Sequence, residues 1–240
     1  MVGPALSWQL RRWTVCASTE VELDRWLRRR DPAQPLTGGL VVMAHQQRFG
    51  QGQRGRVWHS PPGGLWISAA FPWPSPLEAS AALGLAAAVG LAEQLEALGV
   101  AVSLKWPNDL LVDGRKLAGL LPRLRLRGNR VRWAQVGLGL NGTNRPPQGG
   151  ISVAQALAGG GFHPRAKPQR LLPLALAALE RSQQLAGDPD QVRRAAEGLL
   201  LRPPEGFLHG GERWQVLGLE RDGGLRLQRP GAEITLQRSF

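Results

Sequence analysis

Residues 100–119 read VAVSLKWPNDLLVDGRKLAG, a pattern of short apolar runs separated by turn-forming residues. Residues 100–106 are mostly apolar and predict a strand, which Pro107 ends because proline cannot donate a ladder hydrogen bond. Asp113-Gly114 lies between two further apolar runs, and this dipeptide favours a tight hairpin turn. The stretch therefore predicts one strand followed by a β-hairpin.

The chain on both sides of this stretch alternates between predicted strands and helices. Apolar runs predict strands at residues 8–17, 39–44, 65–71 and 131–140, the last entered through a Gly128-Asn129 turn. Periodicity and capping residues predict helices at residues 18–30, 76–98, 153–158, 169–185 and 190–200. Residues 45–64 hold five glycines and two prolines, which predicts a long loop. Together these elements predict an α+β fold.

The last part of the chain changes character at Glu205. Short apolar runs there alternate with turn-forming residues at 209–212, 221–224 and 230–231. Such a pattern over 36 residues predicts a small SH3-like β-barrel. A domain boundary is expected near Arg202-Pro203-Pro204, which divides the chain into residues 1–202 and 203–240.

The charge of the chain first suggests a nucleic-acid partner. The 240 residues are 42% hydrophobic, enough for a buried core, and carry a formal net charge of +12. A strongly basic domain favours nucleic-acid binding. However, the chain has no zinc-finger spacing and no RNA-recognition aromatic motif, with five Phe and no Tyr. Residues 123–132 hold five arginines and no acid. An acidic face of a partner protein is one candidate for what these arginines meet.

Other features of the composition limit the cellular compartment of the protein and the metal or disulfide sites that it can form. The single cysteine, Cys16, excludes an internal disulfide and a cysteine-based zinc site. The first residues lack the apolar run of a signal peptide. The longest uncharged apolar stretch, residues 79–92, is too short to span a bilayer. We therefore expect a cytoplasmic protein with no membrane association, and no dedicated metal site.

Residues 50–58, GQGQRGRVW, match the pattern G-x-G-x-x-G. The dinucleotide-binding fingerprint also needs a following helix and a later acidic residue, and neither is predicted here. What remains is a glycine-rich loop with free backbone N–H groups and two arginines, Arg54 and Arg56, which suits a phosphate. A solvated surface loop is the alternative.

Lys105 and Lys116 are two of only three lysines among 30 basic residues. In a chain that otherwise uses arginine, a retained lysine suggests a site that needs a compact charge with three donors, such as a phosphate site. A lysine whose stem lies along a strand is the alternative.

Gly137 and Gly139 lie inside the predicted strand that ends near Asn141. Glycine weakens a strand unless a ligand or another backbone must come close, so the pair suggests a binding surface. A β-bulge is the alternative. Ser18-Thr19 follows the first strand, and a helix cap is the simplest explanation of this pair taken alone.

Taken in chain order, these segments resemble the biotin–protein ligases, also called biotin–[acetyl-CoA-carboxylase] ligases. Residues 47–61 match Gln-x-x-Gly-Arg-Gly-Arg-x-Gly-Arg-x-Trp-x-Ser-Pro without insertion, and residues 105–109 match Lys-Trp-Pro-Asn-Asp completely. Residues 116–119 match Lys-Leu-Ala-Gly, and residues 137–141 match Gly-x-Gly-x-Asn. The resemblance implies a catalytic domain like those of class II aminoacyl-tRNA synthetases and biotin ligases, a mixed sheet flanked by helices, with the SH3-like domain after it.

The resemblance also implies the activity. Such enzymes join biotin and ATP, with Mg²⁺ bound to ATP, into biotinyl-5′-AMP, and then pass biotin to a lysine of the biotin carboxyl carrier protein of acetyl-CoA carboxylase. The family includes monomers and homodimers. Only seventeen residues precede Ser18. We therefore expect the short form, without an N-terminal DNA-binding domain, and no nucleic-acid partner.

By resemblance, Lys105 is the expected catalytic residue, bridging the biotin carboxylate and the α-phosphate. The residues expected to bind biotin are Ser18, Thr19, Gln47, Gln51, Lys105, Gly119, Gly137, Leu138 and Gly139. The residues expected to bind ATP or its phosphates are Gly50, Gly52, Arg54, Gly55, Arg56, Trp58, Asn108, Lys116 and Asn141.

Three departures from the family pattern are visible. Glu20 stands where the pattern Ser-Thr-Asn has asparagine, and Gln51 and Gln53 stand where the loop has arginines. Pro122 follows the Lys-Leu-Ala-Gly strand, which predicts a sheet edge or a bulge there. A lipoate or octanoate ligase or transferase of the same superfamily is the alternative function, although the complete Lys-Trp-Pro-Asn-Asp motif argues against it.

Overall fold

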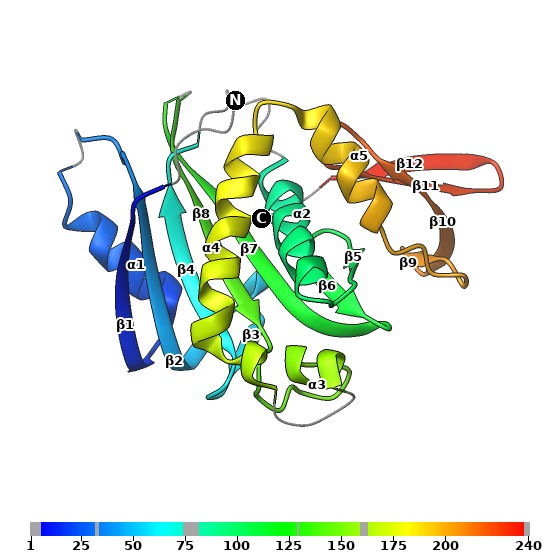
Figure 1. Ribbon diagram of the computed structural model, residues 1–240. Coiled ribbons are helices and arrows are strands. Elements are labelled where there is room, and N and C mark those ends of the chain that lie inside the picture. Colours follow the sequence, from blue (N-terminus) through cyan, green and yellow to red (C-terminus); the bar gives the residue numbers. More distant parts are fainter. Residues whose placement is uncertain (1–5, 32–33, 74–81, 129, 159–162, 238–240) are drawn as a thin grey trace.

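The computed structural model describes residues 6–31, 34–73, 82–128, 130–158 and 163–237 (Figure 1). A mixed eight-stranded sheet forms its centre, with strand order β1-β2-β4-β8-β7-β6-β5 and with β3 paired to β2. β1 and β2 run parallel, and the other neighbours run antiparallel. These strands are β1 Trp8–Cys16, β2 Gly39–Gln51, β3 Val57–Ser60, β4 Leu65–Phe71, β5 Ser103–Lys105, β6 Asp109–Val112, β7 Arg115–Arg127 and β8 Arg130–Leu140.

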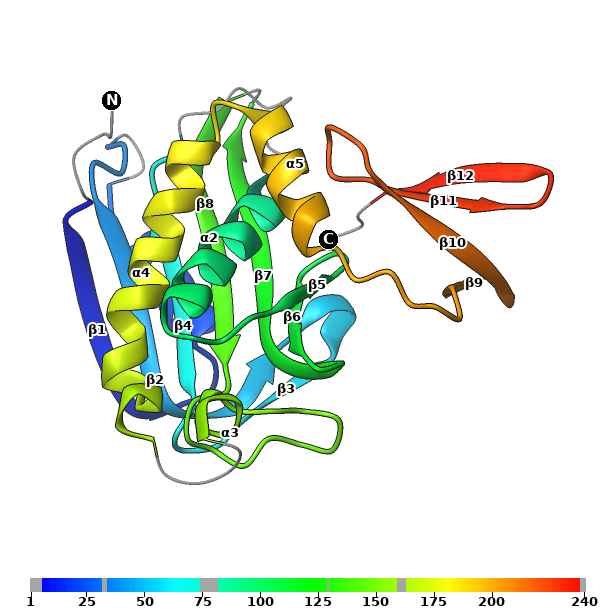
Figure 2. The ribbon, with the colours of Figure 1, turned by 45° about the vertical axis from the view of Figure 1, so that its right-hand side comes forward.

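Helices cover both faces of this sheet. Successive strand residues point to opposite faces, so Val41 and Met43 of β2 belong to the larger core, while Leu40 and Val42 belong to a smaller core under α1. The larger core lies under α2 and α4, as Figures 1 and 2 show. The helices are α1 Thr19–Arg28, α2 Leu83–Ala97, α3 Val153–Ala158, α4 Pro168–Leu185 and α5 Pro189–Leu199.

α2 is the buried helix of the fold. All of its residues from Leu83 to Ala92 are buried, because α4 covers the side that does not face the sheet. The two helices approach closely at Gly90, where an added Cβ would lie 2.3 Å from the carbonyl oxygen of Ala178. Gly99, with φ of +94°, ends the helix as its sequence predicts. The predicted start of this helix at residue 76 lies outside the described residues.

Most predicted strands are confirmed, and the hairpin at Asp113-Gly114 has positive φ at both residues, 48° and 72°. The predicted loop at residues 45–64 is wrong for residues 45–51 and 57–60, which are strands. β2 continues to Gln51 and pairs antiparallel with β3 across a short 3₁₀ turn at Gln53–Gly55, where Arg54 adopts a left-handed φ of 55°. Because this hairpin extends past the core, its side chains show no apolar alternation. Asn129 lies outside the described residues, but β7 and β8 pair as expected.

The C-terminal segment forms a second, antiparallel sheet with the order β12-β11-β10-β9, as expected of a small β domain (Figure 2). Its strands are β9 Phe207–His209, β10 Glu212–Leu219, β11 Leu225–Arg229 and β12 Ala232–Leu236. Trp214, Leu219 and Leu227 are buried in the same apolar cluster as the core of the larger sheet. We keep the boundary at residues 202–203 as a proposal. None of the described helices is long and apolar enough to cross a membrane.

Candidate active site

A cavity of about 160 Å³ lies where α1, the β2–β3 hairpin and the strands β6, β7 and β8 converge. It collects residues from every segment that the sequence singled out. Its lining includes the predicted residues Ser18, Thr19, Gln47, Gln51, Gly52, Arg56, Trp58, Asn108, Lys116, Gly119, Gly137, Leu138 and Gly139. It also includes Glu20, Gln53, Val57, Ile67, Ser68, Asp109, Leu120 and Leu121.

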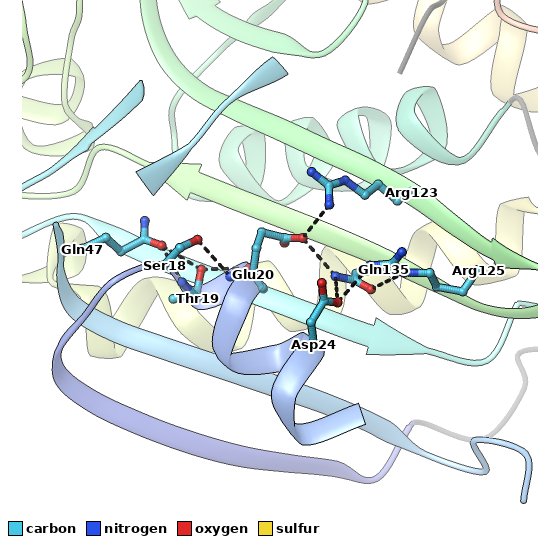
Figure 3. Close-up of polar contacts among 9 residues, drawn as sticks. Ser18, Thr19, Glu20, Asp24, Gln47, Arg123, Arg125 and Gln135 are labelled. Atoms are coloured by element: carbon cyan, nitrogen blue, oxygen red, sulfur yellow. Dashed lines mark hydrogen bonds and ion pairs between the residues drawn. The ribbon is translucent and has the colours of Figure 1, made fainter. Parts of the chain in front are cut away.

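The polar wall of the cavity is the N-terminus of α1. Ser18 caps this helix, because its hydroxyl accepts a hydrogen bond from the Glu20 backbone N–H at 3.3 Å. The backbone N–H and the hydroxyl of Thr19 both donate to Oε1 of Gln47, at 2.7 and 3.0 Å. Nε2 of Gln47 donates to Ser60 Oγ at 2.8 Å. Ser18 and Thr19 therefore lie at the capped start of α1 and also line the cavity (Figure 3).

The indole ring of Trp58 lies against two glycines of the sheet. An added Cβ would lie 2.8 Å from this ring at Gly119 and 2.5 Å from it at Gly139. The two glycines are register partners on β7 and β8, and the pairing has no shift there, so the β-bulge alternative is wrong. The ring nitrogen of Trp58 is buried and has no hydrogen-bond partner among the described residues. The glycines thus provide a flat surface, as expected, and Trp58 lies on it.

Lys116 lies between this cavity and a second one. Its Nζ is 2.7 Å from Oδ2 of Asp109 and 4.7 Å from the centroid of the Trp58 ring. The second cavity, of about 300 Å³, is lined by Trp58, His59, Lys116 and Asn141, together with Val57 and residues 147–150. Nδ2 of Asn141 donates to the Lys116 carbonyl at 3.3 Å. Lys116 therefore lines both cavities.

Four predicted site residues do not line either of these cavities: Lys105, Gly50, Arg54 and Gly55. Lys105 is exposed at the end of β5, where it is the register partner of Asp109. Arg54 and Gly55 form the exposed turn of the hairpin. Of the two lysines expected at the site, Lys116 lines both cavities, and the bridging role of Lys105 stays a prediction.

Glu20 is the cavity residue with the most unusual surroundings (Figure 3). Oε2 of Glu20 accepts from Nε2 of Gln135 at 2.9 Å and lies 3.8 Å from Arg123. Gln135 also donates to Asp24 at 3.1 Å, and Asp24 is paired with Arg125 at 2.9 Å. Burial raises the pKa of Glu20 above its ordinary value, and the hydroxyl of Ser68, Arg123 and Gln135 lower it only in part. The sequence identified Glu20 as a departure from the family pattern but did not reveal these partners.

The described residues contain no group of three or more His, Cys, Asp or Glu side chains that could hold a metal ion. Asp109, a carboxylate of the first cavity, is paired with Lys116.

Comparison with known proteins identifies the family. Residues 17–141, over half of the chain, match the sequence model of the biotin/lipoate A/B protein ligase family. The chain belongs to this family. All four segments that carry the resemblance lie within the matched residues, so the family match and the cavity coincide.

Two curated members of the biotin/lipoate A/B protein ligase family show the level of similarity. The bifunctional ligase/repressor BirA of Bacillus subtilis is 38% identical over 110 residues, which are 45% of this chain and 34% of that protein. The biotin–[acetyl-CoA-carboxylase] ligase of Paracoccus denitrificans is 34% identical over 125 residues, which are 50% of this chain and 51% of that protein. The matched part thus spans between about a third and a half of these relatives.

A solved structure establishes the fold. The biotin protein ligase from Aquifex aeolicus in complex with biotin and ATP superposes with a TM-score of 0.72, at 21% identity, over 95% of both chains. The mixed sheet with flanking helices and the second antiparallel sheet are therefore the fold that the sequence predicted.

Proposed function

We propose that this chain is an ATP-dependent biotin–protein ligase, which forms biotinyl-5′-AMP and pyrophosphate and then transfers biotin to one lysine of a biotin carboxyl carrier protein. The observation that carries the proposal is the place of Lys116, which lines both cavities. The relatives named as biotin ligases support the choice of substrates. We propose a cytoplasmic enzyme that acts as a monomer or a homodimer.

Biotin is assigned to the first cavity. Ser18, Thr19 and Gln47 there offer hydroxyl and amide groups at one end, suited to the donors and the acceptor of the ureido ring. Leu121, on the same face of β7 as Gly119, lines the cavity with them.

ATP is assigned to the second cavity and the glycine-rich hairpin. Trp58 and Asn141 line this cavity and suit an adenine, and Arg56 at the rim of the first cavity suits a phosphate. Mg²⁺ would arrive bound to the triphosphate, its usual mode. Asp109 is the nearby carboxylate that would suit it, and the metal would neutralise phosphate charge.

The first step joins two anions. The biotin carboxylate attacks the α-phosphorus of ATP, an anhydride P–O bond forms, and pyrophosphate leaves. The ammonium group of Lys116 lowers the repulsion between the two reactants and stabilises the charge that develops on the α-phosphate. Asp109 holds this ammonium group in place at 2.7 Å. In the second step the carrier lysine amine attacks the anhydride carbonyl, and AMP leaves.

Label transfer tests the proposal. Labelled biotin, ATP and a carrier domain are incubated with the protein, and pyrophosphate release is followed with biotin or lipoate as the substrate. We expect biotin-dependent release and a labelled carrier. If neither occurs with biotin, the proposal is wrong; release with lipoate alone would establish the alternative function of the superfamily.

A further inference from the structure

The amide of Gln47 forms hydrogen bonds at both of its ends. Its Oε1 accepts from the backbone N–H and the hydroxyl of Thr19, at 2.7 and 3.0 Å, and its Nε2 donates to Ser60 Oγ at 2.8 Å. A backbone N–H can only donate, so the amide oxygen must face Thr19. Gln47 lines the first cavity, so these contacts fix which way its amide lies at the cavity wall.

The hydroxyl of Ser60 fixes the nitrogen end of this amide. Ser60 donates its proton to the carbonyl oxygen of Trp58 at 3.0 Å. Because a hydroxyl has one proton, Oγ can then only accept from Gln47, and Gln47 must present its Nε2. Two neighbours with opposite requirements, Thr19 and Ser60, therefore hold the same amide.

The backbone of the β2–β3 hairpin is shaped around this contact. Gln47 and Ser60 are register partners, and the pairing shifts between Gln47 and Gly50. Gly50 leaves the space that the contact occupies, since an added Cβ would lie 2.6 Å from Ser60 Oγ and 3.2 Å from Gln47 Nε2. Gly50, which lines neither cavity, thus has a steric role beside the hydroxyl.

Ser60 itself is placed behind the cavity wall. It is 3% exposed and lines neither the first nor the second cavity. Any effect of its hydroxyl on the site must therefore pass through Gln47 or through the Trp58 carbonyl. Trp58 is also held as the register partner of Gly50 in the strand ladder. The Gln47 amide is therefore the group that loss of the hydroxyl disturbs most.

We propose that Ser60 is a positioning residue for biotin binding, whose hydroxyl holds the Gln47 amide in one orientation at the cavity wall. The inference rests on the proposed function, in which Gln47 meets the ureido ring. Without the hydroxyl, Nε2 loses this partner and the long side chain is tied at its oxygen end. Biotin binding must then order the amide, which costs side-chain entropy. The affinity should fall about three- to tenfold, the worth of one ordinary hydrogen bond.

The experiment is isothermal titration calorimetry with biotin alone. Ser60→Ala should weaken biotin binding about three- to tenfold, and Ser60→Thr, which keeps the hydroxyl, should stay within about twofold of the wild type. Ser182→Ala is the matched control, because Ser182 is also buried and its hydroxyl donates to a backbone carbonyl, that of Leu179 in α4, at 2.6 Å. It should lower the melting temperature of the protein and leave the biotin affinity unchanged.

A double-mutant cycle with Gln47→Met separates positioning from a general structural effect. Methionine keeps the length of the side chain and removes the amide, so Ser60 has nothing left to hold. In the Gln47→Met protein, Ser60→Ala should therefore change the biotin affinity by less than about twofold. In steady-state adenylation, Ser60→Ala alone should raise KM for biotin and leave kcat and KM for ATP unchanged, as expected when ground-state binding is lost.

An equal loss of biotin affinity from Ser60→Ala with and without the Gln47 amide would overturn the inference while leaving the proposed function intact. So would a Ser60→Ala protein that binds biotin as tightly as the wild type, or a loss confined to kcat. A wild-type protein that binds no biotin would overturn the proposed function, and this inference with it.

Discussion

The ammonium nitrogen of Lys116 lies 2.7 Å from Oδ2 of Asp109, at the place where the two cavities meet. The pair is partly exposed, with the Lys116 side chain at 38% of its full accessibility. Such a pair contributes little to stability. The pair instead fixes a position, because Asp109 holds the Lys116 ammonium group beside Trp58 and between the two proposed substrates.

Lys116→Ala should therefore abolish most of the adenylation reaction. We expect a loss of about 10²–10³ in the rate of biotinyl-5′-AMP formation, the usual cost of removing one group that stabilises transition-state charge. Lys105→Ala is the matched control, since Lys105 is exposed and lies outside both cavities. Biotin-dependent pyrophosphate release measures the adenylation rate of both variants. A larger loss for Lys105→Ala would return the bridging role to Lys105.

Local residue patterns alone do not distinguish these two lysines, and only the family resemblance assigns the bridging role to Lys105. Both belong to the same strand-and-hairpin stretch, and β5 is only three residues long, so alternation along it indicates no face. Lys116 reaches the cavity because β7 pairs with β6 on one side and β8 on the other, next to the surface formed by Gly119 and Gly139. Pairing over this distance along the chain is a tertiary property, which local patterns do not contain.

The raised pKa of Glu20 makes the stability of the fold depend on pH. Its pKa is raised in the folded protein, so its contribution to stability is fully present below its unfolded pKa and is lost as pH rises through the folded value. Glu20→Gln removes this loss. We expect the variant to become more stable than the wild type as pH rises through the folded pKa of Glu20, by up to about 1–3 kcal/mol, the cost of a buried unsatisfied group. At pH 4 the two should be similar.

Urea unfolding of both proteins at several pH values measures this difference. Ser18→Ala, which removes the helix cap, should instead destabilise at every pH by about 1 kcal/mol. A Glu20→Gln protein that is equally destabilised at pH 4 and pH 8 would show that the carboxyl group does not carry a buried charge at high pH.

Gly139→Ala tests the surface under Trp58. The added methyl group would lie 2.5 Å from the indole ring, so the ring must move away from the sheet. Overpacking of this kind costs about 1–3 kcal/mol of stability, and the displaced ring should weaken biotin binding. Gly198→Ala is the control, because nothing lies within 4 Å of its added Cβ and alanine favours the α5 helix. Tryptophan fluorescence and biotin affinity together would detect the movement, and unchanged values in Gly139→Ala would contradict it.

The glycines show how far the sequence prediction extends. Gly137 and Gly139 predict the close approach of a ligand or another backbone, and the binding of a ligand there stays a prediction. What approaches them in the structure is protein, Glu20 at Gly137 and Trp58 at Gly139. The hairpin that carries Trp58 was predicted as a loop, because its strands pair outside the apolar core and show no alternation.

The C-terminal sheet should unfold together with the rest of the protein. Nε1 of Trp106 donates to the Gly223 carbonyl at 2.9 Å, and Glu197 of α5 accepts from the Leu219 backbone N–H at 2.9 Å. Trp214 and Leu219 share the main apolar core. Calorimetry should therefore show one transition.

Trp106→Phe should lower the stability of the protein by about 0.5–1.5 kcal/mol, the value of one hydrogen bond. Trp13→Phe, on the exposed β1 surface, should change the stability little. Two separate transitions would instead support independent domains.

Gln53 lies at the first cavity, where the family pattern places an arginine. A cation at this position would face the phosphate of the bound adenylate, so Gln53→Arg should slow the release of biotinyl-5′-AMP. The side chain is partly exposed, which limits the effect to about 1 kcal/mol, or roughly fivefold in rate.

Gln215→Arg adds the same charge on an exposed strand of the C-terminal sheet and controls for net charge. Release is followed after rapid dilution at low and high salt. The slower release should weaken at high salt, and equal rates for the wild type and Gln53→Arg would mean that this loop position does not hold the adenylate.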